Sequence, residues 1–434
     1  VINKSFYWLI LIFCSYACLL IFPTIGAFNL FDWDEINFAE SSREMLQSLN
    51  YFQVQVNFEP FHEKPPLFFW LQFLSMKLFG ITAFSARFPN AVLAIITPLV
   101  LFKMGKNLKN NSFGIIWSLT YLCGVLPNMY FRTGIIDPYF NLFIFLSLFF
   151  YFQTISVSKN NIRNVLLAGL FAGLGLITKG PVALLIILIV AVVYFLYTRI
   201  FFSIKQLIIF ILVFSLTSVI WYGYEIYNKG LWFLVEFVKY QLELFSTPVA
   251  GHQQPVYYHF LVLLFGCFPF SFFALKNCIK SSGSKIEFEK IMRILFWVVL
   301  ILFTVVSTKI IHYSSMAYFP LSFLAALELY KIEFGKKMKN NLKYAMVGFG
   351  VLISLLLIFL IFSVTHNKQI ILFLIKDTNV HSMINQQINW NGWEWLIPFF
   401  FLLFSLVWLV EKYYRLVYKL LFSMLMLGVF LSLS

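Results

Sequence analysis

The chain of 434 residues has few charged residues for its length. Asp, Glu, Lys and Arg make up 12% of it, whereas soluble domains carry roughly 25%. Hydrophobic residues make up 61%, which is more apolar surface than a soluble core can bury. Apolar runs long enough for the roughly 20 residues of a membrane-spanning helix recur from Phe6 to the C-terminus. The composition therefore excludes a soluble globular domain and predicts an all-α polytopic membrane protein.

Several other signals are missing as well. The five cysteines follow no metal-binding or redox spacing and lie mostly within or beside apolar runs, so we interpret them as packing residues. No repeat relates the two halves of the chain, and no heptad pattern persists. No stretch has the composition of a soluble domain. We therefore predict one membrane domain over residues 1–434, without a separate soluble C-terminal domain.

The positions of the basic residues determine how the net charge of +14 is interpreted. Most lysines and arginines fall in alternate connections between apolar runs, notably 103–109, 276–293 and 331–343, where few acids accompany them. The positive-inside rule assigns these connections to the cytoplasm. The surplus charge therefore indicates membrane orientation, and we predict no nucleic-acid partner.

About thirteen spans account for the apolar runs and the breaks between them. An odd number places the N-terminus inside and the C-terminus outside, and every strongly basic connection then lies on the cytoplasmic side. The expected spans are residues 6–28, 83–103, 113–131, 136–155, 164–178, 180–198, 205–224, 257–276, 291–307, 313–330, 344–364, 393–411 and 416–433.

The first external loop, about residues 29–83, holds much of the external charge. Asp32 and Asp34 are N-cap candidates for a short helix on the membrane surface. Pro65 and Pro66 then open an apolar run over 67–79, which Gly80 closes. About thirteen apolar residues are too few to span a bilayer, so this run predicts a second interfacial helix.

Ionisable side chains that are far apart in the sequence all fall on the external face of this topology. Ionisable groups near a bilayer boundary are costly unless they are paired or functional. Each could instead cap a helix or reach back to water, but their convergence on one face predicts an active site. They are Asp34, Glu35, Glu63, Lys64, Asp137, Lys179, His252, Lys309, His312 and Tyr313.

The residue types in this set suit sugar transfer from a phosphate carrier. The leaving phosphate needs cationic partners, and a hydroxyl acceptor needs a base on the opposite face of the sugar. Lys64, Lys179 and Lys309 can contact the phosphate, and Asp34 is the leading base candidate. Glu63 and His252 offer an oxygen and a nitrogen that could hold a divalent cation such as Zn, Mg or Mn.

The same residues stand in a recognisable order. The segments Asp34-Glu35, Arg43-Glu44 and Glu63-Lys64-Pro65-Pro66 precede Asp137-Pro138 and Thr178-Lys179-Gly180-Pro181. This order resembles the lipid A aminoarabinose transferases and protein O-mannosyltransferase-like enzymes, which are GT-C glycosyltransferases. The resemblance covers roughly the first three quarters of the chain. It implies the GT-C fold, with a large first external loop that carries interfacial helices.

The resemblance also implies an activity. The chain would be an inverting glycosyltransferase of the bacterial inner (plasma) membrane, with its site facing the periplasm. Its donor would be a sugar linked to polyprenyl (undecaprenyl) phosphate, and its acceptor a lipid A, a glycan or a protein. The resemblance implies that Asp34 is the first-loop acid near the reaction centre, that Asp137 lines the cavity, that Lys64, Lys179 and Tyr313 bind the carrier phosphate, and that Glu63 and His252 hold a metal. We add Glu35 and Asp137 to Asp34 as catalytic candidates, and Lys309 and Arg43 to the candidate phosphate ligands.

The chain departs from the family pattern at one position, and a second function competes with sugar transfer. Relatives often carry Arg-Phe where this chain has Leu244-Phe245, so one phosphate contact is either absent or supplied by Lys309. A transporter or flippase of a polyprenyl-linked sugar is the competing function, although such proteins usually show repeated halves. The sequence identifies neither the sugar nor the acceptor. Its oligomeric state is open, and a monomer is compatible with it.

Overall fold

The computed structural model describes residues 4–61, 63–157, 161–246, 254–374, 381, 392–409 and 415–433. Its internal contacts divide the chain into two compact units, Val1–Glu328 and Leu329–Ser434. The described residues are mostly helical, as predicted, and the described candidate site residues all lie in the first unit. The prediction of a single domain over 1–434 stays a prediction.

The elements follow one another along the chain as short and long helices with one small hairpin. In the first unit they are α1 (Lys4–Tyr16), η1 (Ala17–Ile21), α2 (Trp33–Ser48), β1 (Gln55–Val56), β2 (Glu59–Pro60), α3 (Leu67–Phe79), α4 (Ala83–Leu108), α5 (Asn111–Leu122), α6 (Val125–Tyr130), α7 (Asp137–Phe152), η2 (Gln153–Val157), α8 (Ile162–Lys179), α9 (Val182–Thr198), α10 (Ile204–Lys229), α11 (Trp232–Ser246), α12 (Tyr258–Gly266), α13 (Phe270–Ile279), α14 (Phe288–Val305) and η4 (Ile311–Ala317). After α15 (Tyr318–Glu333) come α16 (Asn340–His366), α17 (Lys368–Leu374), η5 (Trp393–Trp395), α19 (Leu396–Leu406), η6 (Val407–Leu409) and α20 (Leu416–Leu433).

Six helical segments of the described chain are long and apolar enough to cross a membrane by length and composition. They are α4, α7 with η2, α8, α10, α16 and α20. Shorter apolar helices include α3, α9 and α13. These lengths agree with a helical membrane protein, and the number of thirteen spans stays a prediction.

Two of the expected spans are interrupted. Residues 113–131 form parts of α5 and α6, which are separated around Gly124, and residues 257–276 are divided between α12 and α13 around Pro269. Pro269 is the N-cap of α13. A proline lacks the backbone N–H that a continuous helix would use, so a helix start accommodates it better than a helix interior.

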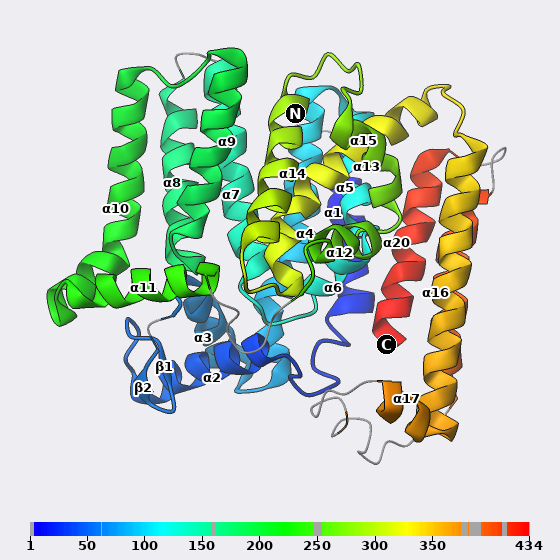
Figure 1. The fold of residues 1–434 in the computed structure, drawn as a ribbon, viewed down its shortest axis with the longest axis horizontal. Coiled ribbons are helices and arrows are strands. Elements are labelled where there is room, and N and C mark those ends of the chain that lie inside the picture. The colour runs from blue at the N-terminus through cyan, green and yellow to red at the C-terminus, as the bar shows by residue number, and fades with distance from the viewer. Residues whose placement is uncertain are drawn as a thin grey trace. The chain divides into compact units, whose positions relative to one another are not determined.

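The first external loop forms the two short helices that its sequence predicts. Asp32 caps α2, since its side chain accepts a hydrogen bond of 3.0 Å from the backbone N–H of Asp34. Helix α3 begins after Pro66 and ends before Gly80. Figure 1 shows α2, α3 and α11 together at one end of α7 to α10, with α11 running across the helix ends, while the N-terminus lies at the opposite end.

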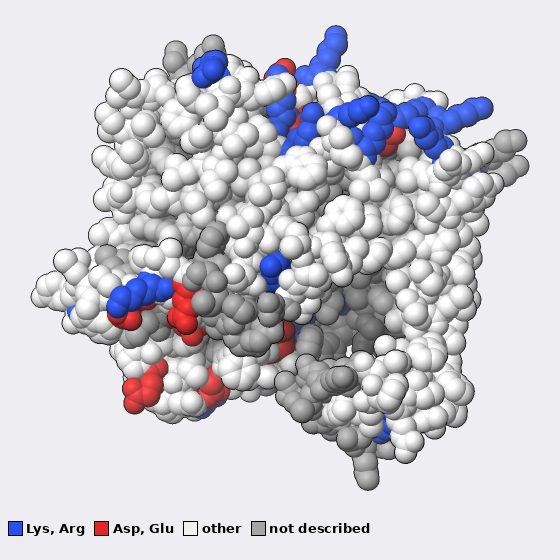
Figure 2. All heavy atoms as spheres, in the orientation of Figure 1, with Lys and Arg blue, Asp and Glu red and all other residues white. Residues whose placement is uncertain are grey.

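Charge is distributed unevenly between these two ends of the first unit. In Figure 2 Lys and Arg side chains gather above α13 and α14, at the end where the N-terminus lies. Acidic side chains are visible at the other end, around α2 and α11. This separation follows the predicted orientation, with the basic end in the cytoplasm.

Polar contacts join the two surface helices to the helices that follow. The Ser42 hydroxyl of α2 donates to the Gln72 Oε1 of α3 at 2.9 Å, and Gln72 Nε2 donates to the carbonyl oxygens of Ala86 at 2.8 Å and Gly134 at 3.3 Å. All these groups are buried. Because an unpaired buried amide is costly, Gln72 holds α2 and α3 in one position against α4 and the start of α7.

Candidate active site

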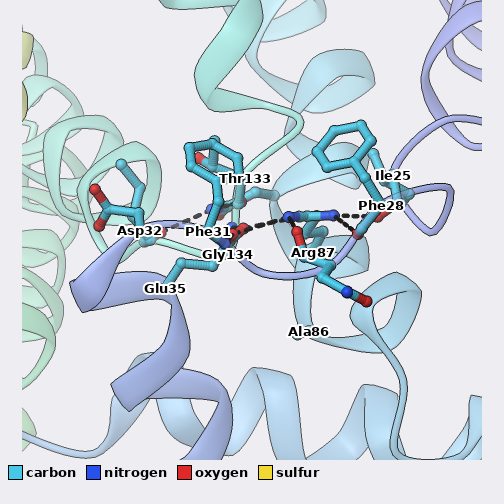
Figure 3. A network of polar contacts seen from close by, with 12 residues as sticks. Ile25, Phe28, Phe31, Asp32, Glu35, Ala86, Arg87, Thr133 and Gly134 are labelled. Atoms are coloured by element: carbon cyan, nitrogen blue, oxygen red, sulfur yellow. Dashed lines mark hydrogen bonds and ion pairs between the residues drawn. The ribbon is translucent and has the colours of Figure 1, made fainter. Parts of the chain in front are cut away.

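A buried ion pair supports the floor of the site. Arg87 of α4 and Glu35 of α2 are both fully buried and form a two-bond contact, Nε to Oε1 at 2.8 Å and Nη2 to Oε2 at 2.9 Å. The same guanidinium donates to the carbonyl oxygens of Ile25 and Phe28, both at 2.9 Å. Figure 3 shows Arg87 between Glu35 and these carbonyls. Such a planar, doubly bonded pair fixes geometry as well as neutralising charge.

The remaining bonds of Glu35 are also internal. Its carboxylate accepts from the backbone N–H of Gly134 at 2.7 Å and of Phe31 at 3.3 Å (Figure 3). With both oxygens engaged and no exposed surface, Glu35 cannot reach a substrate. The prediction that Glu35 is catalytic is therefore corrected: this carboxylate anchors the first external loop to α4 and to the turn before α7.

A mainly apolar cavity of about 370 Å³ lies beside this floor. Most of its apolar lining comes from α9, α11 and α14, and its polar residues come from four separate segments. The polar residues are Lys64, Asp137, Lys179 and Tyr313; the others are Phe140, Pro181, Val182, Leu185, Val238, Leu242, Leu302, Phe303 and Val306. The structure thus brings together two of the three predicted lysines, the predicted tyrosine and Asp137.

Asp137 and Lys179 form an ion pair within this cavity. Asp137 is the first residue of α7 and Lys179 the last of α8, and Lys179 Nζ lies 2.6 Å from Asp137 Oδ1. The ammonium group also lies 5.2 Å from the ring centre of Tyr313. Asp137 lies at the N-terminus of its helix and Lys179 at the C-terminus of its own, where each charge is favourable. Taken by itself, the ion pair could therefore be purely structural. Its position in the cavity wall is what makes Lys179 available to a ligand.

Lys64 reaches the same cavity from the first external loop. Its Nζ lies 5.6 Å from the ring centre of Tyr240 in α11, and the Tyr240 hydroxyl donates to Glu63 in a short hydrogen bond. Burial lowers the pKa of Lys64 below its usual 10.5, while Asp34 and Glu63 oppose that shift. A lysine held in this way gains more from an anionic partner than an exposed lysine would.

Asp34 lies near the cavity cations and contacts a histidine. Its Oδ2 is 3.3 Å from Nε2 of His312, and the side chains are 27% and 4% exposed, respectively. Burial raises the pKa of Asp34, but the contact with His312 and the positive charges of Lys64 and Lys179 outweigh it. The pKa is therefore well below its usual 3.8, and Asp34 stays ionised near neutral pH.

The short helix η4 connects the two parts of the site. His312 and Tyr313 are adjacent on it, and the Ser315 hydroxyl donates to the carbonyl oxygen of His312. Asn141 Nδ2 donates to Ser315 Oγ at 2.8 Å, and Ser315 Oγ lies 3.5 Å from Asp137 Oδ1. The positions of Asp137, Tyr313 and His312 therefore depend on one turn.

Two predicted phosphate ligands lie elsewhere in the described structure. Arg43 pairs with Glu40 on the outer side of α2 and donates to Gln47. Lys309 is 8% exposed and precedes η4. Neither lines the cavity, because helix phase turns Arg43 away and the chain passes Lys309 before it reaches the cavity at Tyr313.

The predicted metal ligands are only partly described. Glu63 contacts Tyr240, and His252 lies outside the described residues. No group of three or more His, Cys, Asp and Glu residues that could hold a metal occurs within the described parts of the chain. The metal stays a prediction, and we derive no chemical step from it.

Three residues of the site had no assigned role in the sequence analysis. His312 stands directly before Tyr313, but only the fold reveals its contact with Asp34. Arg87 and Tyr240 became visible as partners of Glu35 and Glu63. No local pattern could have identified these partners, since 52 and 177 residues separate the members of the two pairs.

Comparisons with known proteins found both sequence relatives and a structural relative. Residues 63–222 match the sequence model of the family described as dolichyl-phosphate-mannose-protein mannosyltransferase. An undecaprenyl phosphate-alpha-4-amino-4-deoxy-L-arabinose arabinosyl transferase of Wigglesworthia glossinidia brevipalpis is 28% identical over 347 residues, which are 76% of this chain and 60% of the relative. The transferase of the same name from Serratia proteamaculans is 26% identical over 74% of this chain and 58% of the relative. The chain thus spans about three fifths of the length of these relatives.

A solved structure shares the fold. The crystal structure of ArnT from Cupriavidus metallidurans bound to undecaprenyl phosphate aligns with a TM-score of 0.79 at 17% identity, covering 98% of this chain and 76% of that chain. The apo state of the same protein aligns with a TM-score of 0.77. At this identity the likeness establishes an ArnT-like fold for the described helices.

Proposed function

We propose, from the match of residues 63–222 to the mannosyltransferase family and the likeness to the arabinosyl transferases, that the chain transfers a sugar from a polyprenyl-phosphate carrier to an external acceptor. The observation that carries the proposal is the cavity that combines apolar walls with Lys64 and Lys179. A lipid phosphate needs both features, since its prenyl chain requires apolar contacts and its phosphate requires cations.

The cavity polar groups have distinct tasks in this proposal. Lys64 and Lys179 contact the carrier phosphate, and Tyr313 offers a hydroxyl donor beside Lys179. Asp137 holds Lys179 in place until the phosphate competes for it. As the bond between sugar and phosphate breaks, negative charge increases on the phosphate, so both ammonium groups stabilise the transition state more than the bound donor.

Asp34 serves the acceptor side. Its ionised carboxylate supplies the negative charge needed close to a hydroxyl that loses its proton. A base on the face of the sugar opposite the phosphate implies inversion at the reacting carbon. Carrier type, inner-membrane location and periplasmic orientation are proposed from the relatives and from the basic end of the first unit. A lipid A, a glycan and a protein each remain candidate acceptors.

A flippase or transporter for a polyprenyl-linked sugar would also use an apolar cavity with cations. The match of residues 63–222 to a mannosyltransferase family favours transfer. The ionised Asp34 beside the cavity cations favours it too, because transport alone requires no carboxylate on the acceptor side.

The experiment compares envelope glycolipids and glycoproteins by mass spectrometry in three strains. One lacks the gene, one expresses the intact chain, and one expresses Asp34→Asn at an equal level. We expect a sugar-sized mass increase on one class of molecule that requires the intact chain. Asp34→Asn keeps the side-chain shape but removes the charge, so transfer should fall by about 10²-fold or more while purified variant still binds undecaprenyl phosphate.

Two results together would contradict transfer and support the flippase. The envelopes of all three strains would be identical, and the purified chain would move the labelled lipid-linked sugar across vesicle membranes. Equal modification by intact chain and Asp34→Asn would leave transfer standing but exclude a role for this carboxylate.

A further inference from the structure

Resting on the proposed function, we propose that His312 takes the proton from a hydroxyl acceptor and that Asp34 orients His312. His312 would then be a catalytic residue of the acceptor side, and Asp34 its positioning partner. The inference narrows the acceptor to a hydroxyl group, as on a glycan or a serine or threonine side chain, because a phosphate acceptor is already an anion.

The geometry of the pair defines the part of each ring nitrogen. Nε2 of His312 lies 3.3 Å from Asp34 Oδ2, and the imidazole is nearly buried. Nε2 makes no aligned hydrogen bond to any described residue in this position, so Asp34 acts on the ring through its charge: a carboxylate at this distance attracts a proton to Nε2, which leaves Nδ1 to accept the proton of the acceptor. In Ser-His-Asp triads a carboxylate fixes the tautomer and stabilises the imidazolium in the same way.

Asp34 by itself is poorly suited to remove the proton of an alcohol. Its pKa is held below the usual 3.8, because the contact with His312 and the nearby cations outweigh the effect of burial. A base works best when its pKa lies near the operating pH. An imidazole, whose ordinary pKa is about 6.5, meets that condition far better than a carboxylate with a lowered pKa.

The place of His312 in the fold separates it from the carrier. Tyr313 lines the apolar cavity, but His312 does not. Ser315 and Asn141 hold the turn on which both residues lie, and Ser315 also contacts Asp137. A displacement with inversion requires the leaving phosphate and the base on opposite faces of the sugar. Adjacent residues of one turn can serve these two faces.

Several titratable or charged groups lie around His312. Helix α2 presents two acids, α12 presents a second histidine, and α7 reaches the turn through Ser315, while the ring of Phe303 in α14 packs against the neighbouring Tyr313. The titratable side chains near this turn are therefore Asp32, Asp34, His259, Asp137 and Lys309. His259 is fully buried and has no hydrogen bond to either ring nitrogen among the described residues. Only His312 of the two has a carboxylate partner there.

The proposed step balances without a further reagent. The acceptor hydroxyl gives its proton to Nδ1 of His312, and its oxygen forms the new bond to the sugar. The bond between the sugar and the phosphate oxygen breaks, and its electron pair remains on the carrier phosphate beside Lys64 and Lys179. The imidazolium then returns its proton to water after the product leaves.

The test uses the full chain in lipid nanodiscs with radiolabelled undecaprenyl-phosphate sugar, and envelope extract of the gene-deleted strain as acceptor. We expect His312→Gln to lower turnover at saturating donor by about 10²-fold or more with donor KM unchanged. If His312 is the base, the activity of the wild type should fall at low pH. The residual rate of His312→Gln should not show this fall. His366→Gln, at the exposed end of α16, is the matched control and should behave as the wild type.

Normal turnover with an unchanged pH profile in His312→Gln would overturn the inference, as would a loss confined to donor KM. Transfer by the wild type onto phosphate groups alone would overturn it too, while leaving the proposed function intact. Absence of any transfer by the wild type would overturn the proposed function itself and the inference with it. Size-exclusion profile and binding of undecaprenyl phosphate establish that His312→Gln is folded; an unfolded variant is replaced by His312→Asn under the same criteria.

Discussion

Neighbouring residues of α2 illustrate how strongly side-chain direction determines a role. Glu35 is fully buried and bonded to Arg87, whereas the Asp34 side chain is 27% exposed and faces His312. Successive residues of a helix point about 100° apart. Two adjacent acids of one motif can therefore serve the fold and the reaction separately, and the chemistry of a carboxylate alone does not distinguish them.

At the residue scale, Lys64 and Lys179 should act on one phosphate although they are far apart in the sequence. Met keeps the length and the apolar stem of lysine but removes the charge. Each of Lys64→Met and Lys179→Met should lower turnover at saturating carrier, and the double variant should lose less than the sum of the two losses in activation free energy, because residues that serve one group are not additive. Steady-state transfer assays of the four proteins measure this directly.

Lys77→Met is the control for that series, since Lys77 is exposed at the end of α3 and does not line the cavity. Its turnover should equal that of the wild type. Additive losses that vanish at saturating carrier would mean that the lysines only anchor the lipid.

At the scale of elements, the site depends on where helices start and stop. Asp137 is placed by the start of α7, and Lys179 by the end of α8. Gly180 ends α8 with a φ of +94°, and a Cβ there would lie 2.8 Å from the ring of Phe237 in α11. The glycine thus allows the chain to turn directly after Lys179 while α11 packs against it.

Gly180→Ala should therefore lower both thermal stability and turnover. A non-glycine residue at this φ costs about 1–3 kcal/mol, and the contact with Phe237 would push α11 from the cavity wall. Gly348→Ala offers the comparison, because it lies within α16 with no atom within 4 Å of the added Cβ. That variant should be neutral or slightly more stable. Thermal unfolding in nanodiscs and transfer rates test both, and an unchanged Gly180→Ala protein would show that α11 adapts to a side chain there.

At the scale of the whole molecule, the proposed site requires one orientation in the membrane. In the first unit many Lys and Arg side chains gather at one end, and the hairpin of β1 and β2 lies with α2 at the other, where acidic side chains accompany the Lys and Arg side chains (Figures 1 and 2). Since the carrier model places the sugar outside, this second end must face the periplasm.

Reporter fusions test the orientation. A reporter fused after Lys106 or Lys280 should be cytoplasmic, and so should one after Lys339, whereas a tag inserted near Asn57 should be accessible from outside. A cytoplasmic Asn57 would place Lys64 on the wrong face and remove the carrier model. The predicted external position near Thr247 lies outside the described residues.

The sequence by itself determined the features that depend on local interactions. Its apolar runs indicated a helical membrane protein, and proline, glycine and capping residues predicted the bounds of α3 and the start of α2. Periodicity and capping involve residues a few positions apart, so a sequence records them directly. The order of Glu63-Lys64 and Thr178-Lys179 also identified the lysines that the cavity brings together.

Only the tertiary structure decided which ionisable groups meet. Lys179 pairs with Asp137 across 42 positions, Glu35 with Arg87 across 52, and His312 reaches Asp34 from a turn near the end of the first unit. Glu35 is buried inside the fold, and Arg43 lies on the outward side of its helix, where it pairs with Glu40. The free energy of a buried charge depends on partners supplied by other elements, and for that reason the contacts of Glu35 and His312 followed from packing rather than from residue order.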